Sequence, residues 1–217
     1  MLVGKNTSAV ELSALRQEEL RPLVEQIETV DLSLFEYVSF HAPSSMAREF
    51  EQEALLLLRR VAEMGWPIIV HPDAMYSAEE WACLGDRLYL ENMDKRKPIG
   101  QTADDLAKFF EILPNASLCF DIGHARQVDP TMSEASAILS RFVDRIQQLH
   151  VSEVNSQSRH DRLTYESVLA FQRVSHLLPT DAPVIVESRV EEREIEEEID
   201  RVRQTLAPES QLALAGD

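Results

Sequence analysis

The chain has 217 residues, 44% of them hydrophobic, and a formal net charge of −17 at pH 7. That length can bury one complete core, so a single domain is expected, and so negative a balance argues against a nucleic-acid backbone as the partner. No run reaches the ~18 apolar residues of a membrane span and the first residues lack a signal-peptide pattern, so we expect a soluble, cytoplasmic protein.

Short apolar stretches alternate with longer segments of helical periodicity along the chain. The predicted strands are residues 9–13, 37–40, 67–70, 88–90, a stretch ending at 121, 146–149 and 183–186. The predicted helices are residues 17–27, 49–64, a short one opening with a capping box at 77–80, 102–113, 133–144, 165–177 and one that begins in the acidic stretch 191–200. Residues 208–217 are expected to form a flexible tail, so the domain covers residues 1–207. Both cysteines, Cys83 and Cys119, are expected to be buried thiols.

A side chain that can bind a metal ion closes each predicted strand. In chain order these residues are Glu11, His41, His71, Glu91, Asp121, His150 and Glu187. Their spacings of 30, 30, 20, 30, 29 and 37 residues each suit one strand and one helix, which indicates a parallel sheet. No GxGxxG or GxxxxGK[ST] motif occurs, and polar residues close nearly every strand, so a (β/α) TIM-type barrel is favoured over a doubly wound sheet.

Only seven strands are visible, whereas a closed barrel of this type has eight. The residues before Ala9 are too few for another strand and helix, so the barrel is expected to lack its first βα unit. Either the chain starts late, or the gap stays open, or a partner fills it. An exposed edge would then be a surface for a homodimer.

Five of the six histidines fall at or just after predicted strand ends, which random placement would not produce. They are His41, His71, His124, His150 and His160, whereas His176 lies in a predicted helix. With Glu91, Asp121 and Glu187 they offer the imidazole and carboxylate ligands that suit Zn²⁺, Mn²⁺, Fe²⁺ or Mg²⁺. Each residue alone could be an ordinary polar residue of the barrel rim, but the group predicts a divalent metal centre.

The ordered strand ends resemble those of the xylose isomerase-like TIM-barrel superfamily over about residues 9–187. The segments that carry the resemblance are SFHAPS, IVHPD, LYLENMD, CFDIGHA, LHVSEVNSQSRHDRL and PVIVES. The superfamily includes sugar and hydroxypyruvate isomerases and epimerases and the endonuclease IV class of apurinic-site endonucleases. The resemblance implies a metal site of Glu91, Asp121, His150 and Glu187. In epimerase-like members the two glutamates are also the catalytic pair, so one of Glu91 and Glu187 would remove a proton beside a carbonyl and the other would return it.

The endonuclease-like members hold three metal ions. The resemblance implies a second site of His41, His71 and a bridging Glu91, and a third that uses His124 and His160. This chain departs from the pattern at Ser158, where those enzymes have Asp, so the third site would lose a carboxylate unless Asp161 replaces it. One to three ions are therefore expected.

Four further residues near the strand ends are expected to bind substrate: Asn92, Glu153, Arg159 and Arg189. For Asn92 and Glu153, support of the metal ligands is an equal alternative. These two arginines, and Arg162 near Arg159 in the sequence, would hold a phosphate or carboxylate of the substrate, or else form surface ion pairs. The one compact basic run, residues 95–97, is read as a solvated loop, with phosphate recognition as the alternative.

The favoured function is that of a divalent-metal-dependent isomerase or epimerase of a small sugar, sugar phosphate or hydroxy-keto acid, acting through a metal-stabilised enediolate. The first alternative is an endonuclease IV-like phosphodiester hydrolase, against which the net charge and Ser158 argue. The second is a catalytically silent metal- or ligand-binding barrel, suggested by the missing strand. The expected partner is a small carbohydrate-like molecule, and neither nucleic acid nor a membrane.

Overall fold

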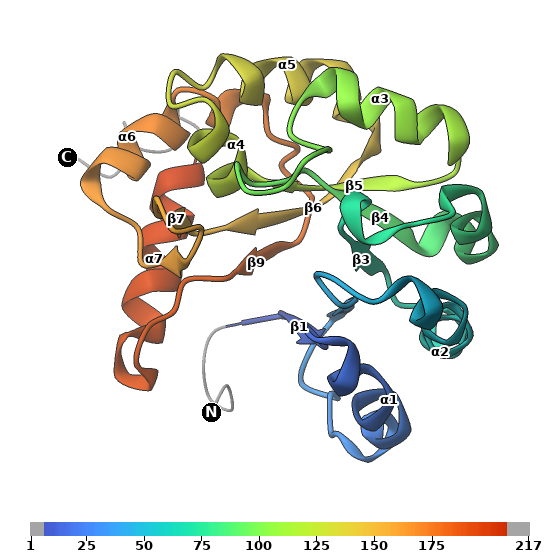
Figure 1. Cartoon of the computed structure of the whole chain (residues 1–217). Coiled ribbons are helices and arrows are strands. Elements are labelled where there is room, and N and C mark those ends of the chain that lie inside the picture. Colours follow the sequence, from blue (N-terminus) through green and yellow to red (C-terminus); the bar gives the residue numbers. More distant parts are fainter. Residues whose placement is uncertain (1–6, 208–217) are drawn as a thin grey trace.

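A parallel sheet forms the centre of the computed structural model, which describes residues 7–207. Seven strands follow one another in the order β1-β2-β3-β4-β5-β6-β9, and every neighbouring pair is parallel. Their bounds are β1 (Ala9–Ser13), β2 (Tyr37–His41), β3 (Ile68–Val70), β4 (Leu88–Glu91), β5 (Ser117–Asp121), β6 (Ile146–Val151) and β9 (Val184–Val186). The predicted seven-stranded (β/α) barrel is confirmed (Figure 1).

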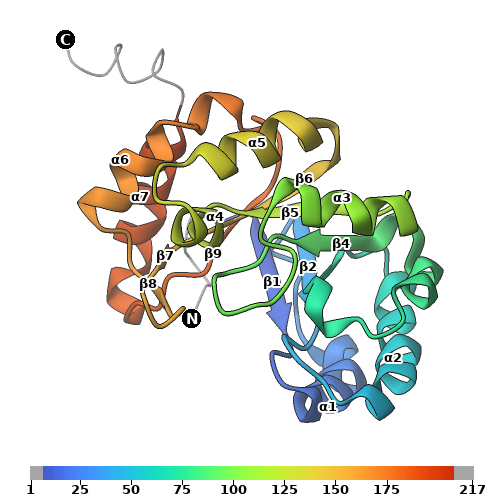
Figure 2. The ribbon, with the colours of Figure 1, turned by 45° about the horizontal axis from the view of Figure 1, so that its top comes forward.

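The barrel is nearly closed, and its seam lies between β1 and β9. Within the described chain these two strands share no ladder hydrogen bonds, so each has a strand partner on one side only. Figure 2 shows β1 and β9 coming together near the middle of the fold. The homodimer expected at this edge stays a prediction.

Helices lie between the strands and cover the outer face of the sheet (Figure 1). The α-helices are α1 (Gln17–Gln26), α2 (Glu51–Glu63), α3 (Ala103–Ile112), α4 (Ile122–Val128), α5 (Ser133–Phe142), α6 (Tyr165–Gln172) and α7 (Ile195–Leu206). Short 3₁₀ helices are η1 (Ile27–Thr29), η2 (Arg48–Phe50), η3 (Pro72–Ala74), η4 (Ala78–Arg87), η5 (Val143–Arg145), η6 (Ser175–Leu177) and η7 (Glu192–Glu194). None of the helices in residues 7–207 has the length and apolar character that a membrane span requires.

The local sequence explains why these helices form and what they bury. In α2, Ala54, Leu57, Leu58 and Val61 recur at helical spacing and are all buried in the core. The start of α3 is capped by Thr102, whose hydroxyl accepts the amide hydrogen of Asp105 at 3.1 Å. The predicted boundaries of these helices are therefore correct to within one or two residues.

Three local expectations are wrong, and one element was missed. Ser77 makes no capping hydrogen bond to the described residues, and the segment that follows is a 3₁₀ helix kinked at Gly85. The helix expected to reach residue 177 ends at Gln172. Cys83 is exposed, whereas Cys119 is buried as expected. A short antiparallel hairpin, β7 (Glu153–Val154) with β8 (His160–Asp161), was not predicted. The tail expected at 208–217 lies outside the described residues.

Candidate metal centre at the barrel mouth

The carboxyl ends of the strands bring the predicted metal ligands together. β-ladder pairing places Asp121 of β5 opposite His150 of β6, and both side chains are fully buried. Glu91 ends β4 and Glu187 follows β9, so the four residues predicted as a metal site come from four neighbouring strands. The parallel arrangement alone explains this convergence, because carboxyl ends of parallel strands share one face of a barrel.

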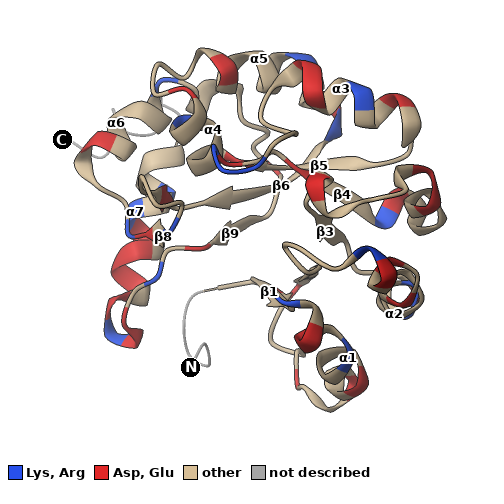
Figure 3. Ribbon diagram, in the orientation of Figure 1, with Lys and Arg blue, Asp and Glu red and all other residues tan. Residues whose placement is uncertain are grey.

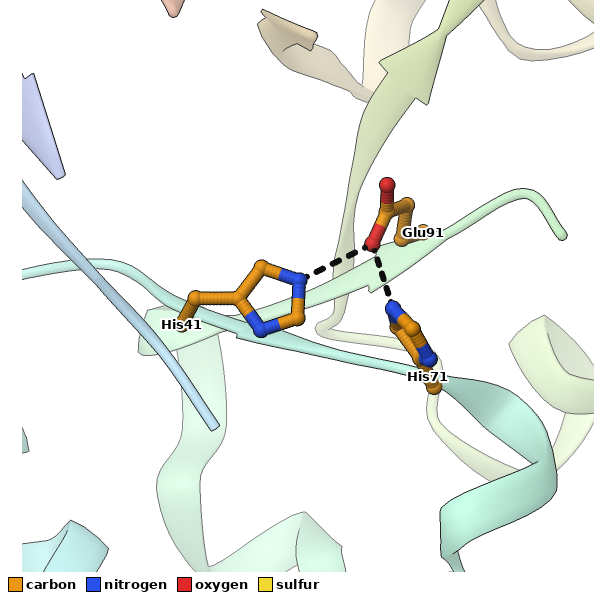
Figure 4. A group of neighbouring side chains, drawn as sticks. All are labelled: His41, His71 and Glu91. Carbon is orange, nitrogen blue, oxygen red and sulfur yellow. Dashed lines mark hydrogen bonds and ion pairs between the residues drawn. The ribbon is translucent and has the colours of Figure 1, made fainter. Parts of the chain in front are cut away.

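Glu91 lies at the centre of the group. Its Oε2 is 3.2 Å from Nε2 of His41 and 3.0 Å from Nε2 of His71 (Figure 4). Its other oxygen, Oε1, is 3.2 Å from Nδ1 of His150. The side chain is 1% exposed. Both carboxylate oxygens of Glu91 therefore face histidines, and these come from different strands.

Ligand atoms gather in three groups within the described residues, each with its atoms within 4.8 Å of one another. The groups are His41, His71 and Glu91; Glu91, Asp121, His150 and Glu187; and Asp121, His124 and His160. Glu91 belongs to the first two groups, and Asp121 belongs to the last two. The eight residues predicted as metal ligands are thus the members of these three groups.

Two of the histidines are oriented by main-chain carbonyl groups. Nδ1–H of His41 donates to the carbonyl of Ala42 at 2.7 Å, and Nδ1–H of His124 donates to the carbonyl of Asn92 at 2.9 Å. In the neutral imidazole, each hydrogen bond fixes the tautomer and leaves the lone pair on Nε2. In His41 that nitrogen faces Glu91, which is the orientation a metal ligand needs.

Asp121 is both a helix cap and a candidate ligand. Its Oδ1 accepts the amide hydrogen of His124 at 2.6 Å and so caps the start of α4. Its Oδ2 is buried and has no hydrogen-bond partner among the described residues, and the same is true of Oε2 of Glu187. Nδ1 of His124 lies 3.5 Å from the first of these oxygens and Nδ1 of His160 lies 3.2 Å from the second, but neither oxygen accepts a hydrogen bond from the described residues. A buried carboxylate oxygen that accepts no hydrogen bond is costly, and a divalent cation would satisfy it. The donor set therefore fits a divalent metal ion.

The unpredicted hairpin supplies the last histidine. His160 begins β8, and its Nδ1 lies 2.8 Å from the hydroxyl of Ser152 and 3.2 Å from Oε2 of Glu187. The hydroxyl of Ser158 instead donates to Oδ1 of Asp94 at 3.1 Å. Asp161 is exposed and accepts a hydrogen bond from Asn155, so it does not replace the carboxylate that Ser158 lacks. Asp121 is the carboxylate of this third group.

Glu11, a strand-end residue to which the sequence assigned no role, also reaches the centre. Its side chain is 4% exposed and lies inside the barrel. Oε2 accepts hydrogen bonds from Ser39 and Gln148, both at 2.8 Å, and lies 3.3 Å from Nε2 of His150. The amide nitrogen of Gln148 also lies 2.8 Å from that Nε2. Its regular place in the series of strand ends was the signal that could have identified Glu11.

Of the four residues predicted to bind substrate, two form internal hydrogen bonds and two are exposed at the cavity. The side chain of Asn92 is buried; its amide group donates to the main-chain carbonyl of Asp121 and accepts the main-chain N–H of Asp121, both at 2.8 Å. These contacts agree with the alternative that Asn92 supports a metal ligand. Glu153 accepts hydrogen bonds from Arg126 at 2.5 Å and from Thr164 at 3.1 Å. Arg159 and Arg189 are exposed and line the cavity above the ligand groups.

This cavity has a volume of about 770 Å³. Its floor includes Glu91, Glu187 and four of the histidines, and its rim carries Arg96, Lys97, Arg159 and Arg189. Lys97 is held in place by Asp73 at 2.9 Å and by the carbonyl of Ser44 at 2.8 Å. The cavity therefore combines carboxylate and imidazole side chains with four basic side chains.

The two glutamates have opposite electrostatic environments. Burial alone would raise the pKa of Glu91, but His150 and His71 hold that pKa well below its ordinary value. Burial raises the pKa of Glu187 to about 8. Burial alone would lower the pKa of His41, but the Glu91 carboxylate raises it to about 9. At neutral pH the metal-free centre therefore holds an ionised Glu91 and a protonated Glu187.

The sequence matches the profile of one protein family. The profile of the family described as "Xylose isomerase-like TIM barrel" matches residues 4–205. No curated protein matches the chain.

Several solved structures share the fold. Endonuclease IV from Thermus thermophilus is 16% identical, with a TM-score of 0.60, and the match covers 91% of this chain and 98% of that one. The 3-keto-D-glucoside 4-epimerase of E. coli is 14% identical, with a TM-score of 0.56, covering 92% and 99%. Thiamine phosphate pyrophosphorylase from Pyrococcus furiosus is 14% identical, with a TM-score of 0.50, covering 89% and 81%. At these identities the likeness establishes the fold and leaves the activity open.

Proposed function

The chain belongs to the xylose isomerase-like TIM-barrel family, and from this premise we propose that it is a metal-dependent phosphoesterase acting on small molecules. Its solved neighbours include both a nuclease and an epimerase, so the choice between hydrolysis and isomerisation depends on the site. The sequence placed isomerisation first because the net charge and Ser158 argue against an endonuclease IV-like hydrolase. The geometry around Glu91 supports the opposite order.

The observation that carries the proposal is the engagement of both Glu91 oxygens. An acid or base in an isomerase needs an oxygen free to exchange a proton with the substrate. Oε2 of Glu91 faces His41 and His71, and Oε1 faces His150, so neither oxygen is free. A carboxylate placed in this way suits a ligand shared by two neighbouring ions, and paired ions are typical of phosphoester hydrolysis.

The ligand groups indicate which residues would hold the ions. His41, His71 and Glu91 would hold one, and Glu91, Asp121, His150 and Glu187 would hold another. The third group, Asp121, His124 and His160, has one carboxylate, which it shares. Bound divalent ions would supply Lewis acidity at the phosphoryl oxygens.

Charge supports a small substrate over a nucleic acid. Two divalent ions would more than offset the three ligand carboxylates of Glu91, Asp121 and Glu187, and would balance them together with Glu11, so the loaded centre would no longer repel an anion. The net charge of −17 would still repel the long row of phosphates in a duplex. A phosphate ester that fits a cavity of about 770 Å³ meets both conditions.

Arg159 and Arg189 are proposed to hold the substrate phosphate. Both line the cavity and are exposed, and within residues 7–207 neither guanidinium forms an ion pair. A free guanidinium beside so many acidic residues is available for an external anion, which it can bind through two parallel N–H donors. The two arginines would therefore orient the phosphoryl group over the ligand groups.

Isomerisation remains the second candidate, and Glu187 is the observation that favours it. Burial raises its pKa to about 8, and its Oε2 has no hydrogen-bond partner in the described part of the chain. A carboxyl group with that pKa could exchange a proton with a carbon acid near neutral pH. In this case Glu187 would serve as the acid or base and Glu91 would only bind metal.

The test compares three reactions in protein loaded with Zn²⁺ or Mn²⁺. The substrates are p-nitrophenyl phosphate with its bis-ester, a panel of ketoses, and a duplex with one abasic site. We expect hydrolysis of the phenyl esters and a fall of about 100-fold in the His71→Ala variant, because the first ion is lost. The control is Lys108→Ala, on the surface of α3.

Three other results would each overturn the proposed phosphoesterase and support a different function. Ketose isomerisation that survives His71→Ala would establish the isomerase, and cleavage at the abasic site would establish the nuclease. Protein that retains no metal and turns over none of the three substrates would leave the binding-only barrel.

A further inference from the structure

A second cavity of about 490 Å³ adjoins the first. It lies between α4, the turn of the β7–β8 hairpin and the loop that follows β4, which includes the blue stretch of residues 95–97 beside α4 in Figure 3. Arg96 and Ser158 line both cavities. The guanidinium of Arg96 donates to the carbonyl of Ser158 at 3.2 Å, so this contact joins the two rims.

The charge of the second cavity is opposite to that of the chain. Lys95, Arg96 and Arg126 line it, and none of the described lining residues is acidic. The whole chain has 38 acidic residues against 21 lysines and arginines. A cavity lined by three cations in such a chain suits an anionic ligand.

Two of the cations are fixed, and the third is free. Arg96 is held by Asp94 at 3.0 Å, and Arg126 is held by Glu153 at 2.5 Å. Lys95 forms no ion pair with residues 7–207, although its main-chain amide donates to Gln127 at 2.9 Å. Its ammonium group is therefore the uncompensated charge of this cavity, on a loop whose main chain is held in place.

The second cavity lies close enough to the metal centre for one ligand to reach both. His124 belongs to the third ligand group and lies on α4, as do Arg126 and Gln127 of the second cavity. Three residues of helix correspond to a rise of about 4.5 Å. A molecule with two anionic groups a few bonds apart could therefore place one over the centre and the other beside Lys95.

We propose that the second cavity binds a second anionic group of the substrate, so that the substrate class is small molecules with two phosphate or carboxylate groups. The hydrolysis of the first phosphate, over the metal centre, rests on the function proposed above. The binding of the second group depends on Lys95 and the two fixed arginines, and it can be measured without turnover.

The test is calorimetric titration of metal-loaded protein with butylphosphonate and with 1,4-butanediphosphonate, neither of which has an ester bond to hydrolyse. We expect the diphosphonate to bind about tenfold more tightly, because it gains a second charge-assisted contact. In Lys95→Ala we expect that advantage to shrink to about twofold or less, with the affinity for butylphosphonate unchanged. Lys95 is exposed, so the substitution leaves the fold intact. Lys108→Ala is the matched control.

Equal affinities for the two phosphonates in wild-type protein would overturn the inference, and so would an equal loss in Lys95→Ala and Lys108→Ala. If instead the proposed phosphoesterase function is wrong, hydrolysis and binding give separate results. If no ester is hydrolysed but the advantage that depends on Lys95 remains, the second anion site stands and only the reaction is wrong.

Discussion

Glu91 and His71 face each other at the barrel mouth, with Oε2 and Nε2 3.0 Å apart. The same oxygen lies 3.2 Å from His41, and the opposite oxygen lies 3.2 Å from His150. One carboxylate therefore lies between the histidine that ends β2, the histidine that follows β3 and the histidine of β6. Removing its charge should affect two ligand groups, whereas removing one histidine should affect one.

Glu91→Gln is expected to lower metal content by more than one ion per chain, and His71→Ala is expected to lower it by one. The reason is that Glu91 belongs to two ligand groups and His71 belongs to one. Elemental analysis after dialysis measures both values. The control is Glu79→Gln, on the surface of η4. Equal losses in the two site variants would contradict the bridging role.

In metal-free protein, Glu187 is expected to make stability depend on pH. Its folded pKa of about 8 lies above the ordinary value of 4.5, so the folded state holds the proton more tightly. The stabilisation is complete below pH 4.5 and is lost as the pH rises through 8.

Urea unfolding of chelator-treated wild type and Glu187→Gln at about pH 5 and about pH 9 tests this dependence. Between these values we expect the wild type to lose a few kcal/mol relative to the variant, which has no proton to release. Parallel pH dependence in the two proteins would refute the assignment.

Asn92→Ala is expected to destabilise the fold by about 2–4 kcal/mol. Its amide group makes two buried hydrogen bonds with the main chain of Asp121, both at 2.8 Å. Their loss would also free Asp121 to move, so metal affinity should fall with stability. Asn115→Ala, in an exposed turn, is the control. An unfolding midpoint equal to that of the control would show that these bonds contribute nothing.

Gly123→Ala is expected to cost about 1–3 kcal/mol of unfolding free energy because the site is overpacked. A Cβ at this position of α4 would collide with the carbonyl oxygen of Ser152 and lie 2.8 Å from Cγ2 of Val154. The helix would have to move away from the end of β6, and Asp121 and His124 would move with it. Thermal unfolding and metal content together measure the effect, and a normal value of both would contradict this close packing.

Replacing Arg159 and Arg189 together by Ala is expected to raise KM for an anionic substrate about tenfold and to change kcat little. Both guanidinium groups are free to bind an anion at the cavity rim. Arg162→Ala is the matched control, since Arg162 is paired with Glu197 at 2.9 Å and does not line the cavity. Equal KM values in the double variant and the control would exclude the arginines from binding.

The sequence was enough to predict that Asp121 and His150 lie close together. Asp121 and His150 lie 29 residues apart, yet strand and helix periodicity placed both at strand ends, and parallel strand ends share one face. Atomic roles were not predictable. Whether Asn92 contacts substrate or the main chain of Asp121 depends on a side-chain rotamer, which no periodicity reports.

Short elements were missed for a physical reason. Each strand of the β7–β8 hairpin has two residues, too few for an alternating pattern, so His160 was placed after a strand end and not on a strand of its own. The capping box expected at Ser77 does not form, and Glu80, its other member, accepts a hydrogen bond from Gln52 of α2. In both places contacts between distant segments decided the local structure.

The seam between β1 and β9 affects how solvent reaches the ligand residues. Among the strands of residues 7–207, β1 pairs with β2 alone, so it can detach while the other strands stay paired. Its amide hydrogens should therefore exchange with deuterium faster than those of β4 or β5, which are paired on both sides. Each opening would carry Glu11 away from His150 and expose the imidazole from inside the barrel. The rate at which a chelator strips the protein would then follow the local unfolding of β1, a second path to the centre besides the cavity mouth.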